Sequence, residues 1–274
     1  MFISLILLSV VLLSASVAFA ATDDNATVSE VNNEIAIGED TLTASNDVVI
    51  QENDTSSAES NVVTNSTFYQ YFDNTGTIYA NVTSEELVFE GDFSNLGVDS
   101  IIINKPIKFS GNDATINGIS ININSDNVTV DGFKLIQNTA PEVIYANASN
   151  VQISNNVIEF EDAAKYNSYG IWAYCVDNFR LINNAITYVG HTNGTTINNV
   201  VRVEGEGYRK ANNVVISGNV FNITIPSAPV QYDDNFNSVD YTNGIVVLGA
   251  ENVTIDDNEI TLEYNNATAA SDTI

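Results

Sequence analysis

The stretch from Asn150 to Phe160 reads NVQISNNVIEF, and this pattern decides the fold. Apolar residues alternate with polar ones on both sides of a central asparagine pair, first at Val151 and Ile153 and then at Ile158 and Phe160. A period of two places successive side chains on opposite faces of a β-strand. The stretch therefore predicts two short strands, each with one apolar face, joined at an asparagine corner.

The same pattern recurs along the chain. Five segments begin with asparagine and continue with alternating apolar residues, at 127–130, 150–153, 178–181, 213–216 and 252–255. Six residues after the leading asparagine, the first copy has Phe133 and the other four have a second asparagine, namely Asn156, Asn184, Asn219 and Asn258. A third apolar segment precedes three copies, at Gly170-Ile171, Gly244-Ile245 and, more loosely, Glu142-Val143. Each repeat therefore predicts three short strands.

Such a unit cannot bury its own apolar face, whereas coils stacked about 4.8 Å apart with parallel pairing bury a continuous apolar column. The recurring asparagine fits a corner, because its short amide tolerates left-handed backbone and can bond a like amide on the next coil. Leading asparagines lie 23 to 39 residues apart, which indicates loops inserted at 188–199, 204–212 and 226–243. The predicted fold is an all-β parallel β-helix solenoid.

The chain from about Leu87 onward resembles the right-handed parallel β-helix, or pectin-lyase-like, repeat proteins, whose signature is Asn-Val-x-Ile-x-x-Asn-x-Ile. The segments 87–97 and 104–107, the apolar N-terminus and the Asn-rich acidic composition are together similar to adhesin-like surface proteins of methanogenic archaea. This resemblance implies a right-handed solenoid. It is less specific for function, because the superfamily contains polysaccharide lyases, glycoside hydrolases and non-catalytic adhesins.

Charge restricts the partners. The chain carries 35 acidic and 8 basic side chains, a formal net charge of −27, and such a surface repels nucleic acid and anionic lipid. One cysteine and one histidine exclude a disulfide scaffold and the usual zinc sites. Calcium binding, carbohydrate binding and catalysis by carboxylates remain open.

The N-terminus predicts an extracellular protein. Residues 1–20 are almost continuously apolar and end in Ala18-Phe19-Ala20, which is typical of a secretory signal peptide, with an uncleaved membrane anchor as the alternative. Residues 21–66 are acidic and rich in Ser, Thr and Asn, so we expect a disordered spacer. Residues 67–100 are expected to cap a β-helix that occupies 101–274. The predicted location is secreted or on the cell surface.

Ten Asn-x-Ser/Thr sequons agree with that location, although an Asn-rich chain acquires many of them by chance. Glycosylation is therefore an expectation for Asn25, Asn53, Asn65, Asn81, Asn127, Asn147, Asn193, Asn222, Asn252 and Asn266.

Enzymatic chemistry has few candidate residues. Arg180 is a candidate lyase base, with a surface ion pair as the simpler interpretation. Asp233-Asp234 and Asp256-Asp257 are candidate acid pairs of a glycoside hydrolase, but Asp256-Asp257 also aligns with the turn residues of other coils. Glu204 and Glu206 alternate onto one face near two arginines, which favours a charged loop base.

A calcium site is a weaker expectation. Asp233, Asp234, Asn235, Asn237 and Asp240 supply oxygens in one loop, but the glycine and final glutamate of an EF-hand are absent. A solvated acidic loop is the alternative. We expect no other cofactor.

One strand face is unusually aromatic. If Ile171, Ala173 and Cys175 point inward, Trp172 and Tyr174 point outward and form a candidate ligand-binding face. On this alignment, the outward residues of neighbouring coils are Ile144, Ala146, Val246 and Leu248. A carbohydrate groove, a partner surface or cover by inserted loops would each explain such a stripe.

The two remaining reactive side chains have simpler explanations than catalysis. Cys175 aligns with turn residues of other coils and is expected to pack there, whereas His191 lies in a Gly- and Thr-rich loop.

The sequence therefore favours a non-catalytic, adhesin-like surface protein that binds glycans or surface proteins through β-helix faces and inserted loops. The alternative is a polysaccharide lyase or glycoside hydrolase of the same fold. A third class is a surface-layer component, because exposed β-helix ends allow self-association. Contact with a membrane is expected only through an uncleaved N-terminal segment.

Overall fold

The structure, a computed structural model, describes residues 61–161, 168–190, 197–225 and 241–264. All described residues lie in one compact unit. The expected signal peptide and most of the expected spacer lie outside the described residues. Within these ranges, no helix is long and apolar enough to cross a bilayer.

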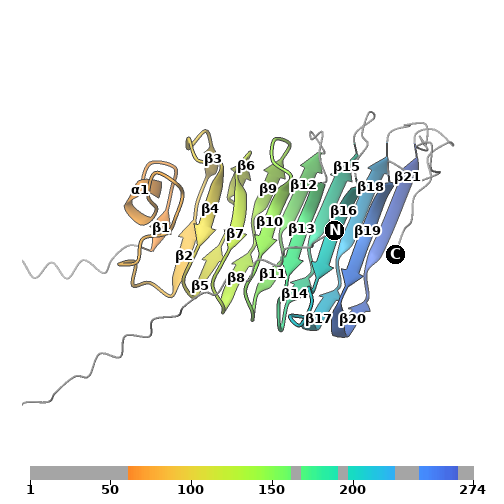
Figure 1. Cartoon of the computed structure of the whole chain (residues 1–274). Helices are drawn as coiled ribbons and strands as arrows, with labels where there is room; N and C mark the ends of the chain where they lie inside the picture. Colours follow the sequence, from red (N-terminus) through yellow and green to blue (C-terminus); the bar gives the residue numbers. More distant parts are fainter. Residues whose placement is uncertain (1–60, 162–167, 191–196, 226–240, 265–274) are drawn as a thin grey trace, which may run out of the picture. The chain divides into compact units, whose positions relative to one another are not determined.

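The described residues form three parallel sheets (Figure 1). The eight-stranded sheet has the order β1 (Val62–Val63), β2 (Glu86–Phe89), β5 (Ile107–Ser110), β8 (Val128–Asp131), β11 (Gln152–Ser154), β14 (Arg180–Ile182), β17 (Ala211–Ser217) and β20 (Ala250–Asp256). The six-stranded sheet has β4 (Ser100–Ile103), β7 (Ser120–Ile123), β10 (Glu142–Ala146), β13 (Ser168–Tyr174), β16 (Ile197–Glu204) and β19 (Tyr241–Leu248). The seven-stranded sheet has β3 (Asp92–Ser94), β6 (Thr115–Asn117), β9 (Lys134–Gln137), β12 (Val157–Glu161), β15 (Ala185–Val189), β18 (Val220–Ile225) and β21 (Glu259–Tyr264).

From β4 onward each coil contributes one strand to each sheet. From β4 onward the chain passes repeatedly from the six-stranded sheet to the eight-stranded and then the seven-stranded sheet. The register stacks the repeats as aligned in the sequence, so that Val130, Ile153 and Leu181 are consecutive partners. The predicted all-β parallel β-helix is therefore confirmed.

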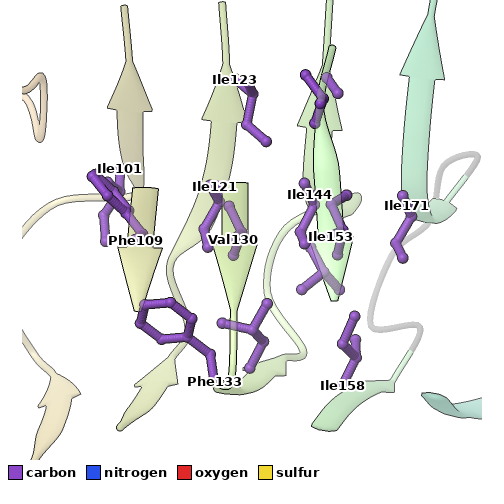
Figure 2. Packing of buried hydrophobic residues seen from close by; sticks show 14 of the residues in the cluster. Ile101, Phe109, Ile121, Ile123, Val130, Phe133, Ile144, Ile153, Ile158 and Ile171 are labelled. Atoms are coloured by element: carbon purple, nitrogen blue, oxygen red, sulfur yellow. The ribbon is translucent and has the colours of Figure 1, made fainter. Parts of the chain in front are cut away.

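Inward-facing residues form one continuous core (Figure 2). Ile101, Ile121, Ile144 and Ile171 occupy successive strands of the six-stranded sheet, and each is fully buried. The expected inward residues of the seven-stranded sheet are also at most 2% exposed from Leu135 to Ile223. This continuous burial is the main favourable term of the fold.

The two asparagine positions have different roles. The leading asparagines Asn127, Asn150, Asn178, Asn213 and Asn252 all adopt positive φ between 53° and 61°. Asparagine tolerates this left-handed conformation, which lets the chain turn sharply between two sheets. The leading asparagines therefore shape the corner backbone, as predicted.

The second asparagines form a buried ladder. The Nδ2 group of Asn156 donates to Oδ1 of Asn184 at 3.0 Å, Asn184 donates to Asn219 at 3.0 Å, and Asn219 donates to Asn258 at 2.9 Å. Each acceptor also binds the backbone N–H of the asparagine one coil before, at 2.9–3.0 Å. Where the first copy has Phe133, its backbone N–H donates to Asn156 at 2.9 Å. The predicted amide ladder is confirmed.

Aromatic residues close the N-terminal end of the core. Helix α1 (Phe68–Tyr71) stacks Phe68 on Phe72 with ring centroids 4.4 Å apart, and Phe72 meets Phe109 edge-on. Strand β1 pairs Val63 with Phe89 and buries Val63 completely. The structure therefore includes residues 61–66 of the expected spacer, because Val62 and Val63 supply apolar surface that the core can cover.

The last described coil is open. Val253 and Ile255 are 36% and 45% exposed, and Ile260 and Leu262 are only partly buried although they occupy inward positions. Their counterparts one coil earlier are buried because another strand lies against them. Among the described residues, no strand stacks on β19, β20 or β21 from the far side.

The buried ladder gives a stability prediction. We expect Asn184→Ala to lower the free energy of unfolding by roughly 3 kcal/mol, because the buried N–H and Nδ2 of Asn156 and the carbonyl of Ile153 lose their partner. Asn222→Ala, at an exposed position of β18, is the matched control and should change it by less than about 0.5 kcal/mol. Urea unfolding measures the change in unfolding free energy for both variants. Equal losses of stability would contradict a stabilising role of the buried ladder.

Candidate functional site

The outer face of the six-stranded sheet carries an aromatic column. Tyr145 of β10 is the direct partner of Trp172 of β13, and Trp172 is the partner of Arg202 of β16. Asn122 and Val246 flank this column on the outer strands. Strands β10, β13 and β16 thus place two aromatic rings and a guanidinium on three adjacent coils.

This register corrects the sequence alignment for one coil. Ile144 and Ala146 were expected outward beside Trp172 and Tyr174, but both are fully buried and pair with Ile171 and Ala173. Val143 and Ile144 are consecutive inward residues, so the alternation shifts by one residue within β10. The other two expected neighbours, Val246 and Leu248, do lie in the outward rows.

The same shift in β13 adds a residue that sequence analysis missed. Gly170 and Ile171 are both buried, which turns Tyr169 as well as Trp172 to the outer face. The Trp172 ring lies 5.0 Å from Tyr169, 5.1 Å from Tyr145 and 5.9 Å from Tyr174, measured between centroids. We call Tyr145, Tyr169, Trp172 and Tyr174 the aromatic patch. A strict period of two would have placed Tyr169 inward.

An ion pair between Arg202 and Glu204 lies at the edge of this patch. Arg202 donates Nε and Nη2 to the two carboxylate oxygens of Glu204 at 2.8 Å each, and its guanidinium lies 5.4 Å from the Tyr169 ring centre. The Arg202 hydrogen bonds lower the pKa of Glu204, with a smaller contribution from Trp172. The indole Nε1 of Trp172 is buried, and among the described residues no acceptor completes a hydrogen bond to it, although the Glu204 carboxylate lies close enough for Trp172 to lower its pKa.

Glu142 lies next to the patch on the same face. It is the strand partner of Tyr169, and burial raises the pKa of its carboxyl group. Burial also raises the pKa of Tyr145, and the nearby Cys175 and Glu142 add to this effect. Glu206 receives a hydrogen bond from the Tyr174 hydroxyl. The polar groups around the aromatic patch are therefore mostly acidic.

The other candidate residues lie apart from this patch. Cys175 is 8% exposed with φ 53°, as expected of a thiol packed in a turn. Arg180 lies on the outer face of the eight-stranded sheet, between Gln152 and Val215. Asp257 has φ 53° at a corner, which agrees with the turn interpretation. Asp256, the residue before it, is the strand partner of Ser217.

The predicted metal residues are Asp233, Asp234, Asn235, Asn237 and Asp240, and they lie outside the described residues, as does His191. Within the described ranges, no group of three or more His, Cys, Asp or Glu side chains is arranged to hold a metal ion.

Six sequon asparagines fall in the described ranges. Five of them are exposed, namely Asn65, Asn81, Asn127, Asn222 and Asn252, and Asn147 is partly buried. Asn25, Asn53, Asn193 and Asn266 lie outside the described residues.

Comparisons of the chain with protein-family models, with curated proteins and with solved structures find no match.

The two acidic neighbours of the patch give a pH prediction with opposite signs. The raised pKa of Glu142 means that its ionisation destabilises the folded state as pH rises, so Glu142→Gln should raise stability at about pH 7 and have no effect at about pH 3. The lowered pKa of Glu204 contributes stability that is lost as pH falls, so Glu204→Gln should lower stability at about pH 7 and lower it less at about pH 3.

Each effect should stay within about 1 kcal/mol, because both groups retain contact with solvent. Thermal unfolding at the two pH values measures them. Shifts of the same sign at about pH 7 would contradict this assignment.

Proposed function

We propose that this protein is a non-catalytic, adhesin-like binding protein that acts outside the cell and holds glycan chains on the aromatic patch. The observation that carries the proposal is the cluster of four partly exposed aromatic rings on one outward sheet face, where solvent-facing strands usually carry polar residues.

Aromatic rings suit sugars because the apolar C–H face of a pyranose packs on a ring while its hydroxyl groups bond polar neighbours. The patch supplies both kinds of group. Rings of Tyr145 and Trp172 lie on adjacent coils, and the Arg202–Glu204 pair and the tyrosine hydroxyls lie beside them.

The charge of the site favours neutral glycans. Arg202 is already paired with Glu204, and Glu142 and Glu206 add acidic groups near the rings. A polyanionic chain would meet these groups as well as the net charge of −27. Neutral polysaccharides carry no charge and therefore meet no such electrostatic repulsion.

The cellular setting rests on sequence features. The apolar residues 1–20 and the sequons support secretion or display at the cell surface, where glycans and surface proteins are the available partners. A single shallow site of this kind binds weakly, but many copies displayed together would hold a polymer through multivalency.

The central test is Trp172→Ala. We expect the purified protein to be retarded on at least one neutral polysaccharide in affinity electrophoresis, and Trp172→Ala to weaken that binding about tenfold or more through loss of ring stacking. Tyr79→Ala, which removes an exposed ring from the N-terminal region, is the matched control and should bind normally. Equal binding by both variants would contradict the role of the patch.

An assay of reaction products separates binding from catalysis. The protein should release neither new reducing ends nor unsaturated uronides from plant, microbial or host polysaccharides, with or without calcium. Release of either product would instead favour a lyase or hydrolase of this fold.

A further inference from the structure

The outer face of the eight-stranded sheet holds a groove of about 380 Å³. Its walls come from three consecutive coils and include Asn178, Arg180, Asn213, Val215, Asn252 and Thr254. The groove lies on a different sheet from the aromatic patch.

A break in the corner asparagines opens this groove. Asn213 donates its Nδ2 to Oδ1 of Asn178 at 3.1 Å, and Asn178 donates to Asn150 at 2.8 Å, so the leading asparagines form a second, exposed ladder. Asn252 does not continue it, because its Nδ2 donates instead to Oδ1 of Asn212 at 2.8 Å. Oδ1 of Asn213 is therefore left without a donor among the described residues, at the groove wall.

Arg180 is the cation of this groove. In the described part of the chain, four cations lie in ion pairs: Lys108 with Glu86, Lys134 with Glu159, Arg202 with Glu204 and Lys210 with Glu251. Arg180 is exposed, and no carboxylate lies within ion-pair distance of it in the same ranges. An arginine left unpaired on so acidic a protein is available for an external anion.

We propose that this groove binds an acidic sugar, with the Arg180 guanidinium paired to the sugar carboxylate. A guanidinium matches the two oxygens of a carboxylate with two parallel N–H donors. Oδ1 of Asn213 and the hydroxyl of Thr254 are placed to bond sugar hydroxyls, and Val215 supplies an apolar contact. The site is separate from the proposed function of the aromatic patch and does not depend on it.

The surroundings favour a sugar over a peptide. Peptides commonly bind a sheet by adding a strand to its edge. Strands β14 and β17, which carry Arg180 and Val215, are paired on both sides and so offer only side chains around the guanidinium, whereas β20 has a free edge among the described residues. Side-chain amides and a hydroxyl suit the hydroxyl groups of a sugar ring.

The net charge limits the ligand to few carboxylates. One carboxylate gains the local pairing with Arg180, whereas each further carboxylate of a polymer meets only the repulsive field of a protein with net charge −27. The expected ligand is therefore a glycan with an isolated acidic sugar rather than a polyuronate.

The test compares methyl β-glucuronide with methyl β-glucoside, which lacks the carboxylate. Titrations of the full protein are followed by NMR on the side-chain amides of asparagine. We expect the glucuronide to bind on the order of tenfold more tightly than the glucoside, as a charge-assisted hydrogen bond predicts. Tetragalacturonate should bind no more tightly than the glucuronide at low salt. Equal binding of the two glycosides, or tighter binding of the tetrauronide, would overturn the proposal.

Variants locate the binding. Arg180→Gln should remove the preference for the glucuronide, whereas Arg209→Gln, an equal change of charge at another exposed arginine, should keep it. Val215→Glu places a carboxylate directly opposite Arg180 and should also abolish binding, which gives a second test if Arg180→Gln fails to fold.

Trp172→Ala should leave glucuronide binding intact, so a failure of the aromatic patch is distinguishable from a failure of this groove. Unchanged binding in Arg180→Gln would overturn the assignment.

Discussion

Parallel pairing in register is the constraint on which this structure depends. Because each strand lies directly against the equivalent strand of the next coil, every side chain stands beside its counterparts one coil before and one coil after. Side chains that repel each other or fit poorly would lower stability again at every pair of adjacent coils. Accordingly, like residues are stacked in columns, such as isoleucine in the six-stranded sheet and asparagine at the corners.

The buried ladder shows what this constraint does to polar groups. A buried amide normally costs stability unless its donors and acceptors are satisfied. Asn156, Asn184 and Asn219 satisfy theirs with the next asparagine and with backbone groups of neighbouring coils. The corner is stable only as part of a stack, so a single repeat would not hold its shape.

Both candidate binding surfaces arise where the regular repeat is interrupted. In β13 two consecutive inward residues turn Tyr169 and Trp172 to the same face, and at the corner Asn252 turns away from Asn213. A regular solenoid presents uniform columns, whereas these two irregularities create a ring cluster and a groove. Their chemistry also differs, since the ring cluster is bordered by acidic groups and the groove contains an unpaired arginine. The two surfaces therefore present different chemistry on two sheets of one β-helix.

Sequence patterns predicted the three-strand repeat, the apolar columns and the two asparagine positions, because period-two alternation and recurring corner residues are local features. The sequence also placed Trp172 and Tyr174 on the outer face. It could not determine the register of the coil around Ile144, because that alignment relied on the loosely matching Glu142-Val143 segment and assumed unbroken alternation. Tyr169, the pairing of Arg202 with Glu204 and the break at Asn252 were decided only by the tertiary structure. Tyr169 faces outward because alternation breaks within β13, Arg202 meets Glu204 on one face of β16, and Asn252 bonds Asn212 of the preceding coil. Residue spacing alone fixes none of these three contacts.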